Sequence, residues 1–251
     1  MDFKDESNII EYLKFRKQVW KKYHHHLSEL LKSNYKKAVL LTYWLNDYLK
    51  YICREKTFKP SQNINYEKGQ IVKVHFGYRI GNEIGGPHYA VVLDVKSYTD
   101  NGTITVVPLK SKRVKTSRYS RIYHLDLGNA FKNTIYEEVS KTKTVTTQKL
   151  VKLINKIKET SGEDYAGNKE IEAAIKELKT RQAFENEILK FSETISDSSV
   201  ADLGQITTVS KIRIIHPTKN KHVLTNIKLP KDIMKKINDR IHYLYLSDTN
   251  D

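Results

Sequence analysis

A glycine-rich loop between two apolar stretches carries the residues of this chain best suited to chemistry. The loop holds Glu83 and His88, a carboxylate and an imidazole five residues apart, and such a pair can transfer protons near neutral pH. The glycines between them let the backbone approach a ligand closely. The alternative is an ordinary long hairpin loop with solvated polar residues, and the loop alone does not decide between the two.

Alternating apolar and polar residues on both sides of this loop predict an α+β fold built around a small sheet. The predicted strands are 70–76, 89–96, 103–109 and 121–127, followed later by about 204–216 and 221–228. Short strands at this spacing are typical of a curled sheet or a small barrel. Helical periodicity predicts two helices within 7–53, a helical hairpin within 130–195, and a final helix at 230–246.

A basic run follows the third predicted strand and includes two tyrosines. Cations next to aromatic rings are the combination that single-stranded RNA binding uses. The residues of this run that we select as RNA contacts are Lys112, Arg113, Lys115 and Arg118. A basic surface segment without a ligand is an equally good interpretation of the run.

The composition favours a polyanionic partner. The chain has 251 residues, and 44 Lys and Arg outweigh 29 Asp and Glu to give a net charge of +15. Such an excess favours RNA or DNA. No apolar run reaches about 18 residues, so we expect no transmembrane helix and no membrane partner. A single cysteine and an N-terminus without an apolar signal core predict a cytoplasmic protein. We expect no metal and no cofactor.

Segments spread along the chain resemble the PemK/MazF family of toxin ribonucleases. The similar segments are Gly69 through Phe76, Gly81-Asn82-Glu83, His88 through Leu93, Val106 through Ser111, Val200 through Val209, and the closing helix. In the family these places read as a G-D strand ending in F, a G-S-E loop, R-P-A-V-V-L, V-P-x-T-[ST] and a late D-Q segment. The resemblance covers about 69–127 and 198–246. It predicts a small SH3-like, PemK-type β-barrel at 66–127 and 198–251, with an N-terminal helical hairpin at 1–60 and an inserted helical segment at 128–197.

The resemblance implies a metal-independent endoribonuclease that cleaves single-stranded RNA and thereby inhibits translation and growth. It also implies a homodimer with an RNA groove, and a cognate acidic antitoxin as partner. The family places an Arg at the head of R-P-A-V-V-L and a Thr after V-P-x. This chain has His88 and Lys110 at those positions, and Gly204 where the family has Asp before Gln205.

We therefore expect a catalytic site of four residues. His88 would exchange a proton, Lys110 would neutralise a phosphate oxygen, Ser111 would donate a hydrogen bond, and Glu83 would act as base or orient His88. The expected supporting RNA contacts are Arg79, Asn82, Gln205 and Thr208. Two other functions remain open: a non-catalytic nucleic-acid-binding module on the same barrel, and a helical interaction protein in which the barrel is a scaffold.

Overall fold

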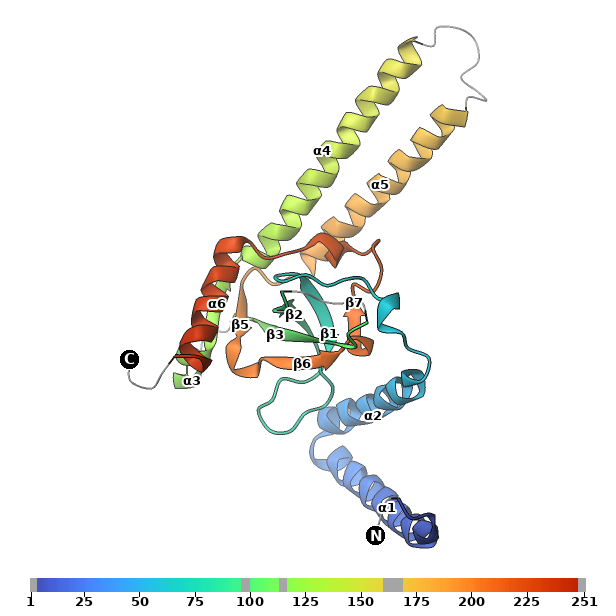
Figure 1. Ribbon diagram of the computed structural model, residues 1–251, viewed down its shortest axis with the longest axis vertical. Coiled ribbons are helices and arrows are strands. Elements are labelled where there is room, and N and C mark those ends of the chain that lie inside the picture. Colours follow the sequence, from blue (N-terminus) through green and yellow to red (C-terminus); the bar gives the residue numbers. More distant parts are fainter. Residues whose placement is uncertain (1–3, 96–99, 113–116, 160–168, 248–251) are drawn as a thin grey trace. The chain divides into compact units, whose positions relative to one another are not determined.

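The computed structural model describes residues 4–95, 100–112, 117–159 and 169–247 (Figure 1). The chain divides into two compact units. The first unit contains Met1–Thr57 and Gly77–Ile80, and the second contains Phe58–Phe76 and Gly81–Asp251.

The first unit is a pair of helices, as expected for 7–53. A 3-10 turn at Glu6–Asn8 leads into α1 (Ile9–Ser33), and α2 (Tyr35–Glu55) follows. Asn34 separates the helices, and its side-chain oxygen accepts a 3.0 Å hydrogen bond from the Lys37 amide at the start of α2. Gly77 also belongs to this unit, with φ at +81° and a would-be Cβ only 2.6 Å from the Trp44 ring. Glycine is needed there for both reasons.

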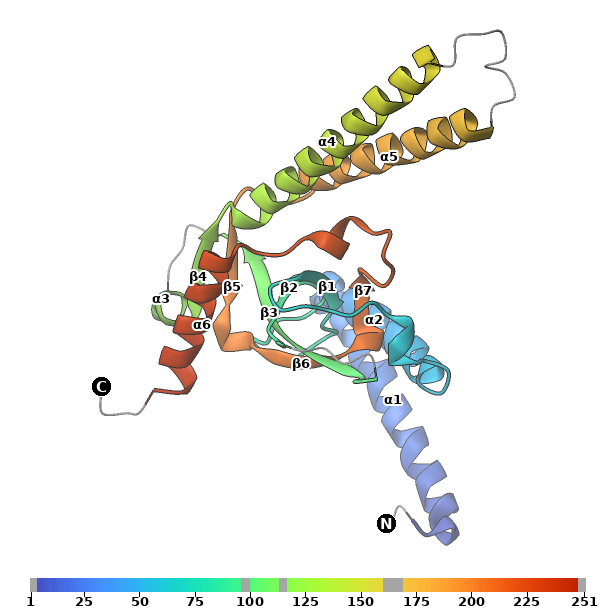
Figure 2. The same cartoon turned by 45° about the horizontal axis from the view of Figure 1, so that its top comes forward.

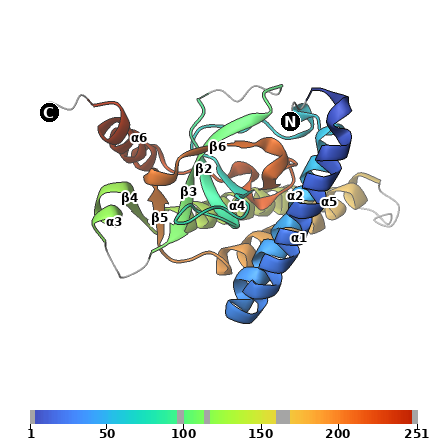
Figure 3. The ribbon, with the colours of Figure 1, turned by 90° about the horizontal axis from the view of Figure 1, so that it is seen from below.

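The second unit is built on an antiparallel sheet. Its strands are β1 (Ile71–His75), β2 (Pro87–Val92), β3 (Thr103–Ser111), β4 (His124–Gly128), β5 (Ser199–Asp202), β6 (Thr207–Ser210) and β7 (Ile214–His216). The order is β4-β5-β3-β2-β1-β7, and β6 also pairs with β3. Figure 3 shows the curl of these strands from below. Within the described residues β4 and β7 do not pair, so the sheet is not closed.

Side-chain alternation divides the strands between two hydrophobic cores. On β1, Ile71 packs into one core, while its neighbour Val72 packs into the other. On β3, Val107 and Leu109 join the first core, and Val106 joins the second. Successive side chains of a strand point to opposite faces, so the sheet is buried in part on both sides.

The helices of the second unit cover one end of the sheet. They are α3 (Arg118–Tyr123), α4 (Ala130–Glu159), α5 (Lys169–Glu193) and α6 (Lys231–Tyr245). Helices α4 and α5 lie side by side and extend from the sheet, with Phe131 and Ile188 at their bases buried in the first core (Figures 1 and 2). Among the described residues, no helix is long and apolar enough to cross a bilayer.

Three predicted strand segments are wrong in whole or in part. The prediction at 121–127 ignores the short helix α3, so the strand begins only at His124. At 221–228 the chain instead forms a 3-10 turn, Val223–Asn226, and pairs with the sheet through a single bridge between Gln70 and Lys228. The reason is a local cap: Nδ1 of His222 accepts a 3.0 Å hydrogen bond from the Leu224 amide. Such side-chain caps favour turns over strands. Shorter 3-10 turns lie at Pro60–Gln62, Leu203–Gln205 and Lys211–Arg213. The last two interrupt the predicted segment 204–216, which therefore forms two short strands, β6 and β7.

Candidate active site

The sheet register brings His88 and Lys110 together. The last residue pair of β2 and β3 is Ala90 with Pro108, and His88 and Lys110 each lie two residues beyond it, on the same face of the sheet as that pair. Directly opposed residues of an antiparallel pair share a face of the sheet. Burial lowers the pKa of His88, and the Lys110 ammonium lowers it further, whereas the carbonyls of Leu109 and Gly85 act in the opposite direction. His88 is therefore neutral at pH 7 and able to accept a proton.

A buried carboxylate holds Lys110 in place. The Lys110 ammonium forms an ion pair with Oδ2 of Asp202, whose side chain is fully buried at the end of β5. Lys110 is opposite Val200, so Asp202, two residues further along, lies on the same face of the sheet as Lys110. A buried carboxylate needs such a partner, because an unpaired buried charge is costly.

Two more polar side chains converge on Asp202. The Tyr119 hydroxyl from α3 donates a 3.2 Å hydrogen bond to Oδ1, and burial, followed by the Asp202 carboxylate, raises the pKa of Tyr119 to about 12. His124 is opposite Asp202 in the β4–β5 register, and its Nε2 lies 3.4 Å from Oδ2. That nitrogen is buried and has no hydrogen bond of acceptable geometry to any described residue. The result is one polar face with a neutral base, an anchored cation and a buried anion.

Gln205 connects this face to the glycine-rich loop. Its Oε1 accepts a 3.2 Å hydrogen bond from the Ile84 amide, and its Nε2 donates one of 3.4 Å to the Asn82 carbonyl. Gln205 also hydrogen-bonds with Tyr119. The structure thus places Gln205 and Asn82 at the site, with Asn82 contributing its backbone. Glu83 is exposed in this loop and, within the described residues, makes no hydrogen bond or ion pair, so it does not orient His88.

Two other expected residues on the sheet lie elsewhere. Ser111 follows Lys110 directly in β3, so the two side chains point to opposite faces; Ser111 pairs with Ser199. Thr208 is on β6 opposite Thr105, and their hydroxyls are 3.2 Å apart near the other end of β3.

The expected basic residues are dispersed. Lys112 forms a 2.5 Å ion pair with Asp126, and Arg118 is exposed at the start of α3. Arg79 belongs to the first unit with α1 and α2. Arg113 and Lys115 lie outside the described residues.

Comparison with known families identifies the region that carries β1–β4. Residues 67–178 match the family model of the PemK-like, MazF-like toxin of type II toxin–antitoxin systems. This region is PemK-like. The match confirms the resemblance to this family over 69–127. It continues through α4 into α5, which the sequence resemblance left out, and it ends before β5, so it does not cover 198–246. No curated protein matches the chain.

The candidate site depends on residues that sequence reasoning missed. Asp202, His124 and Tyr119 were not among the expected site residues. Asp202 had a detectable signal, since an acidic residue inside the apolar stretch Ser199–Leu203 must find a buried cation or hydrogen-bond donor. Tyr119 had only its place in the basic run.

The structure explains why glycine stands at position 204, where the family motif has an acidic residue. A Cβ at Gly204 would lie 2.1 Å from the Tyr119 hydroxyl oxygen, far inside van der Waals contact. The Tyr119 hydroxyl thus occupies the space that a side chain at 204 would need. The site keeps a carboxylate two positions earlier, at Asp202.

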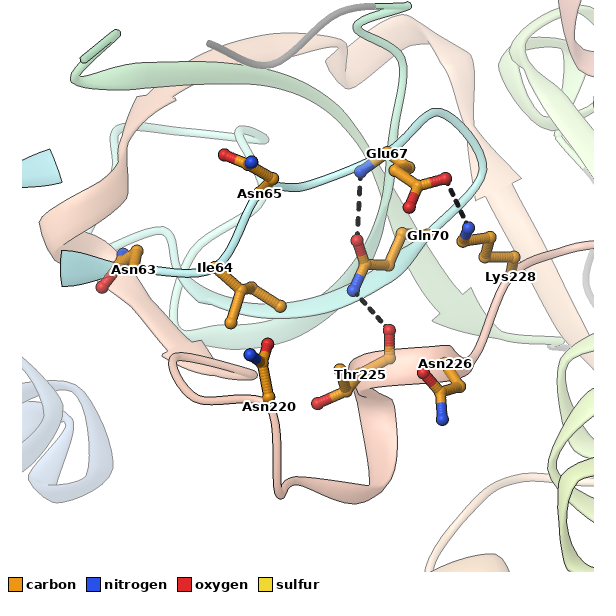
Figure 4. A pocket seen from close by; sticks show the side chains of 9 residues that line it. All are labelled: Asn63, Ile64, Asn65, Glu67, Gln70, Asn220, Thr225, Asn226 and Lys228. Atoms are coloured by element: carbon orange, nitrogen blue, oxygen red, sulfur yellow. Dashed lines mark hydrogen bonds and ion pairs between the residues drawn. The ribbon is translucent and has the colours of Figure 1, made fainter. Parts of the chain in front are cut away.

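A separate pocket in the second unit holds none of these residues (Figure 4). It is lined by Asn63, Ile64, Asn65, Glu67, Gln70, Asn220, Thr225, Asn226 and Lys228. The buried Gln70 amide accepts from the Glu67 amide at 3.1 Å and donates to the Thr225 carbonyl at 2.9 Å, and Lys228 pairs with Glu67 at 2.5 Å. These mutual bonds tie β1 to the 3-10 turn that follows β7, which is a structural role. No group of three or more His, Cys, Asp or Glu within the described residues is arranged to hold a metal ion.

Proposed function

We propose that this protein is the toxin of a type II toxin–antitoxin pair and acts as an endoribonuclease on single-stranded RNA, inhibiting translation and growth. The observation that carries the proposal is the position of His88 near Lys110 on one face of the sheet, with Lys110 held by the buried Asp202. The PemK-like match over 67–178 supports the same function.

The proposed chemistry requires a base, a cation and a protonated donor. Neutral His88 takes the proton of a ribose 2′-hydroxyl, and the 2′ oxygen then attacks the adjacent phosphorus. The Lys110 ammonium stabilises the negative charge that develops on the phosphorane and donates a proton to the departing 5′ oxygen. The P–O5′ bond breaks, leaving a 2′,3′-cyclic phosphate and a 5′-hydroxyl. Asp202 positions Lys110, and Gln205 positions the loop that precedes His88.

The proposal extends to architecture and partners. We infer that residues 66–127 and 198–251 form an open version of the SH3-like, PemK-type barrel, which is the curled sheet of the second unit. Residues 1–60 and 128–197 are helical additions to that core. A cytoplasmic homodimer with an RNA groove, neutralised by a cognate acidic antitoxin, completes the proposal, and the net charge of +15 suits both polyanionic partners.

The test is cleavage of a labelled single-stranded RNA beside the same oligonucleotide with 2′-deoxy sugars. His88→Ala should reduce the cleavage rate by roughly 10²-fold or more, the usual contribution of a general base. His25→Ala, an exposed histidine of α1, is the matched control and should cleave normally. Wild-type activity in His88→Ala, or cleavage of the 2′-deoxy oligonucleotide, would remove His88 and the 2′-hydroxyl from the mechanism.

One observation favours the alternative, a non-catalytic nucleic-acid-binding module. The charge of Lys110 is already paired with Asp202, so it has less capacity to stabilise a phosphorane. Salt-dependent RNA binding without cleavage products, together with expression that leaves growth unchanged, would support that function instead.

A further inference from the structure

Helix α1 leaves nearly all of its apolar surface in water. It contains no buried residue, and every residue from Ile9 to Gln18 is exposed. The large side chains Leu13 and Trp20 are 43% and 63% exposed. In water a single amphipathic helix gains most of its stability by packing its apolar face, so α1 lacks the contact that such a helix requires.

The exposed side chains follow the spacing of a helix–helix seam. Positions alternating by four and three residues define the α1 seam, whose members are Ile9, Leu13, Arg16, Trp20, Tyr23, Leu27 and Leu30. A repeat of this kind, averaging 3.5 residues, is the pattern by which one helix packs along another. Leu27 and Leu30, near the turn to α2, are partly buried, whereas the seam members from Ile9 to Tyr23 are exposed. The open part of the seam is long enough to receive several turns of another helix.

The positive charge of α1 indicates the charge that its partner should carry. Helix α1 carries six Lys and Arg against the two acids Glu11 and Glu29, a net of +4. Lys17 lies directly beside the seam, one turn after Leu13, whereas Lys14, Lys21 and Lys22 lie further round the helix. A second copy of α1 would bring the same net charge of +4 alongside the first, and like charges on two paired helices oppose pairing.

We propose that the open α1 seam binds an acidic amphipathic helix of a separate polypeptide. The partner would present Leu or Ile at the same 3.5-residue spacing and Glu or Asp at the flanking positions, opposite Lys17 and within the positive field of α1. The surface belongs to the first unit alone, and the proposal does not depend on the nuclease activity of the second unit.

The experiment uses the full-length chain and a fluorescently labelled synthetic peptide of about 28 residues, four heptads, with Leu at the seam positions and Glu beside them. A control peptide has Lys in place of Glu. Fluorescence anisotropy should show binding of the Glu peptide and at least roughly tenfold weaker binding of the Lys peptide.

Matched protein variants locate the contact. Leu13→Glu, in the seam, should weaken binding of the Glu peptide by roughly tenfold or more, whereas Gln18→Glu, on the opposite side of α1, should not. Lys17→Glu should weaken it several-fold, whereas Lys22→Glu, away from the seam, should have little effect. The variants Lys17→Glu and Lys22→Glu keep the apolar face of α1 intact. Their comparison therefore remains informative if circular dichroism shows that Leu13→Glu reduces the helicity of α1.

Several outcomes would overturn the proposal. They are failure of the Glu peptide to bind, equal affinity for both peptides, and equal effects of Lys17→Glu and Lys22→Glu. Sedimentation that shows self-association abolished by Leu13→Glu would assign the seam to a second copy. The wild-type protein could instead bind phosphatidylglycerol vesicles and fail to bind the Glu peptide. If Leu13→Glu abolished that vesicle binding, the seam would be assigned to a membrane surface.

Discussion

Tyr119 and Gly204 form a matched pair beside the proposed site. Gly204→Ala should force the Tyr119 ring away, because the new Cβ would lie 2.1 Å from its hydroxyl oxygen and 2.8 Å from the adjacent ring carbon. Overpacking of this kind costs about 1–3 kcal/mol of unfolding free energy, measurable by urea denaturation. In a Tyr119→Ala background the same substitution should cost almost nothing. An equal cost in both backgrounds would show that the tyrosine is not the obstacle.

The titration of His88 tests its environment without reference to catalysis. Burial and the Lys110 ammonium both lower its pKa, so its NMR titration midpoint should lie under the usual value of about 6.5. Lys110→Met removes one of the two causes and should move the midpoint upward. In the wild-type protein, the proposed RNA cleavage, which depends on neutral His88, should persist as pH falls to about 6.5 and decline only below it. A midpoint unmoved by Lys110→Met would place the ammonium too far from the imidazole to matter.

At this residue scale, the sequence predicted part of the site. The order of the strands was sufficient to expect that His88 and Lys110 meet, since each lies near the end of a strand in one hairpin series. Asp202 could not be assigned to Lys110, because 92 residues separate the two, including both long helices. The register between β3 and β5 depends on how those helices return the chain to the sheet, and local patterns do not encode that return.

Most elements that position the site show the regular periodicity of a strand or a helix in their sequence. The elements that do not are short. Strands β1 to β3 show the alternation that the sequence predicts. Helix α3 spans Arg118–Tyr123, fewer than two turns, so its sequence shows no recognisable helical period and predicts the beginning of a strand. Yet α3 delivers Tyr119 to Asp202. Sequence patterns are thus least informative for short elements such as α3, and the site depends on such an element.

Strand alternation gives a prediction for neighbouring residues of β3. Lys110→Ala should greatly reduce RNA cleavage, whereas Ser111→Ala should leave it near the wild-type rate, because the two side chains point to opposite faces of the sheet. Rates measured on one labelled RNA are sufficient for the comparison. Lys110→Ala also leaves Asp202 buried without its cation, a loss of about 3–5 kcal/mol for such pairs, so both variants should first be compared by urea unfolding. Strong inactivation by Ser111→Ala would restore the serine to the site.

The whole molecule combines two units of very different packing. The second unit contains both hydrophobic cores, whereas Ala38 and Gly77 are the buried residues among those described in the first unit. The local stability against unfolding should therefore be lower in the first unit than in the second. Hydrogen–deuterium exchange should be fast in α1 and slow in β1, β2 and β3. Uniformly slow exchange across α1 in the isolated protein would mean that its face is covered, by self-association or another contact.

Net charge acts on the whole molecule, and its contribution to RNA binding depends on which cations remain unpaired. Lys110 and Lys112 already pair with Asp202 and Asp126, while Arg118 has no ion pair within the described residues. If Arg118 contacts one phosphate, Arg118→Ala should reduce the slope of log affinity against log salt by about 0.7, the value for one counterion on a single strand. Lys228→Ala, whose cation is paired with Glu67, is the matched control and should preserve the slope. A slope unchanged by Arg118→Ala would move the RNA path away from α3, and the search for phosphate contacts would turn to the other basic surfaces of the second unit.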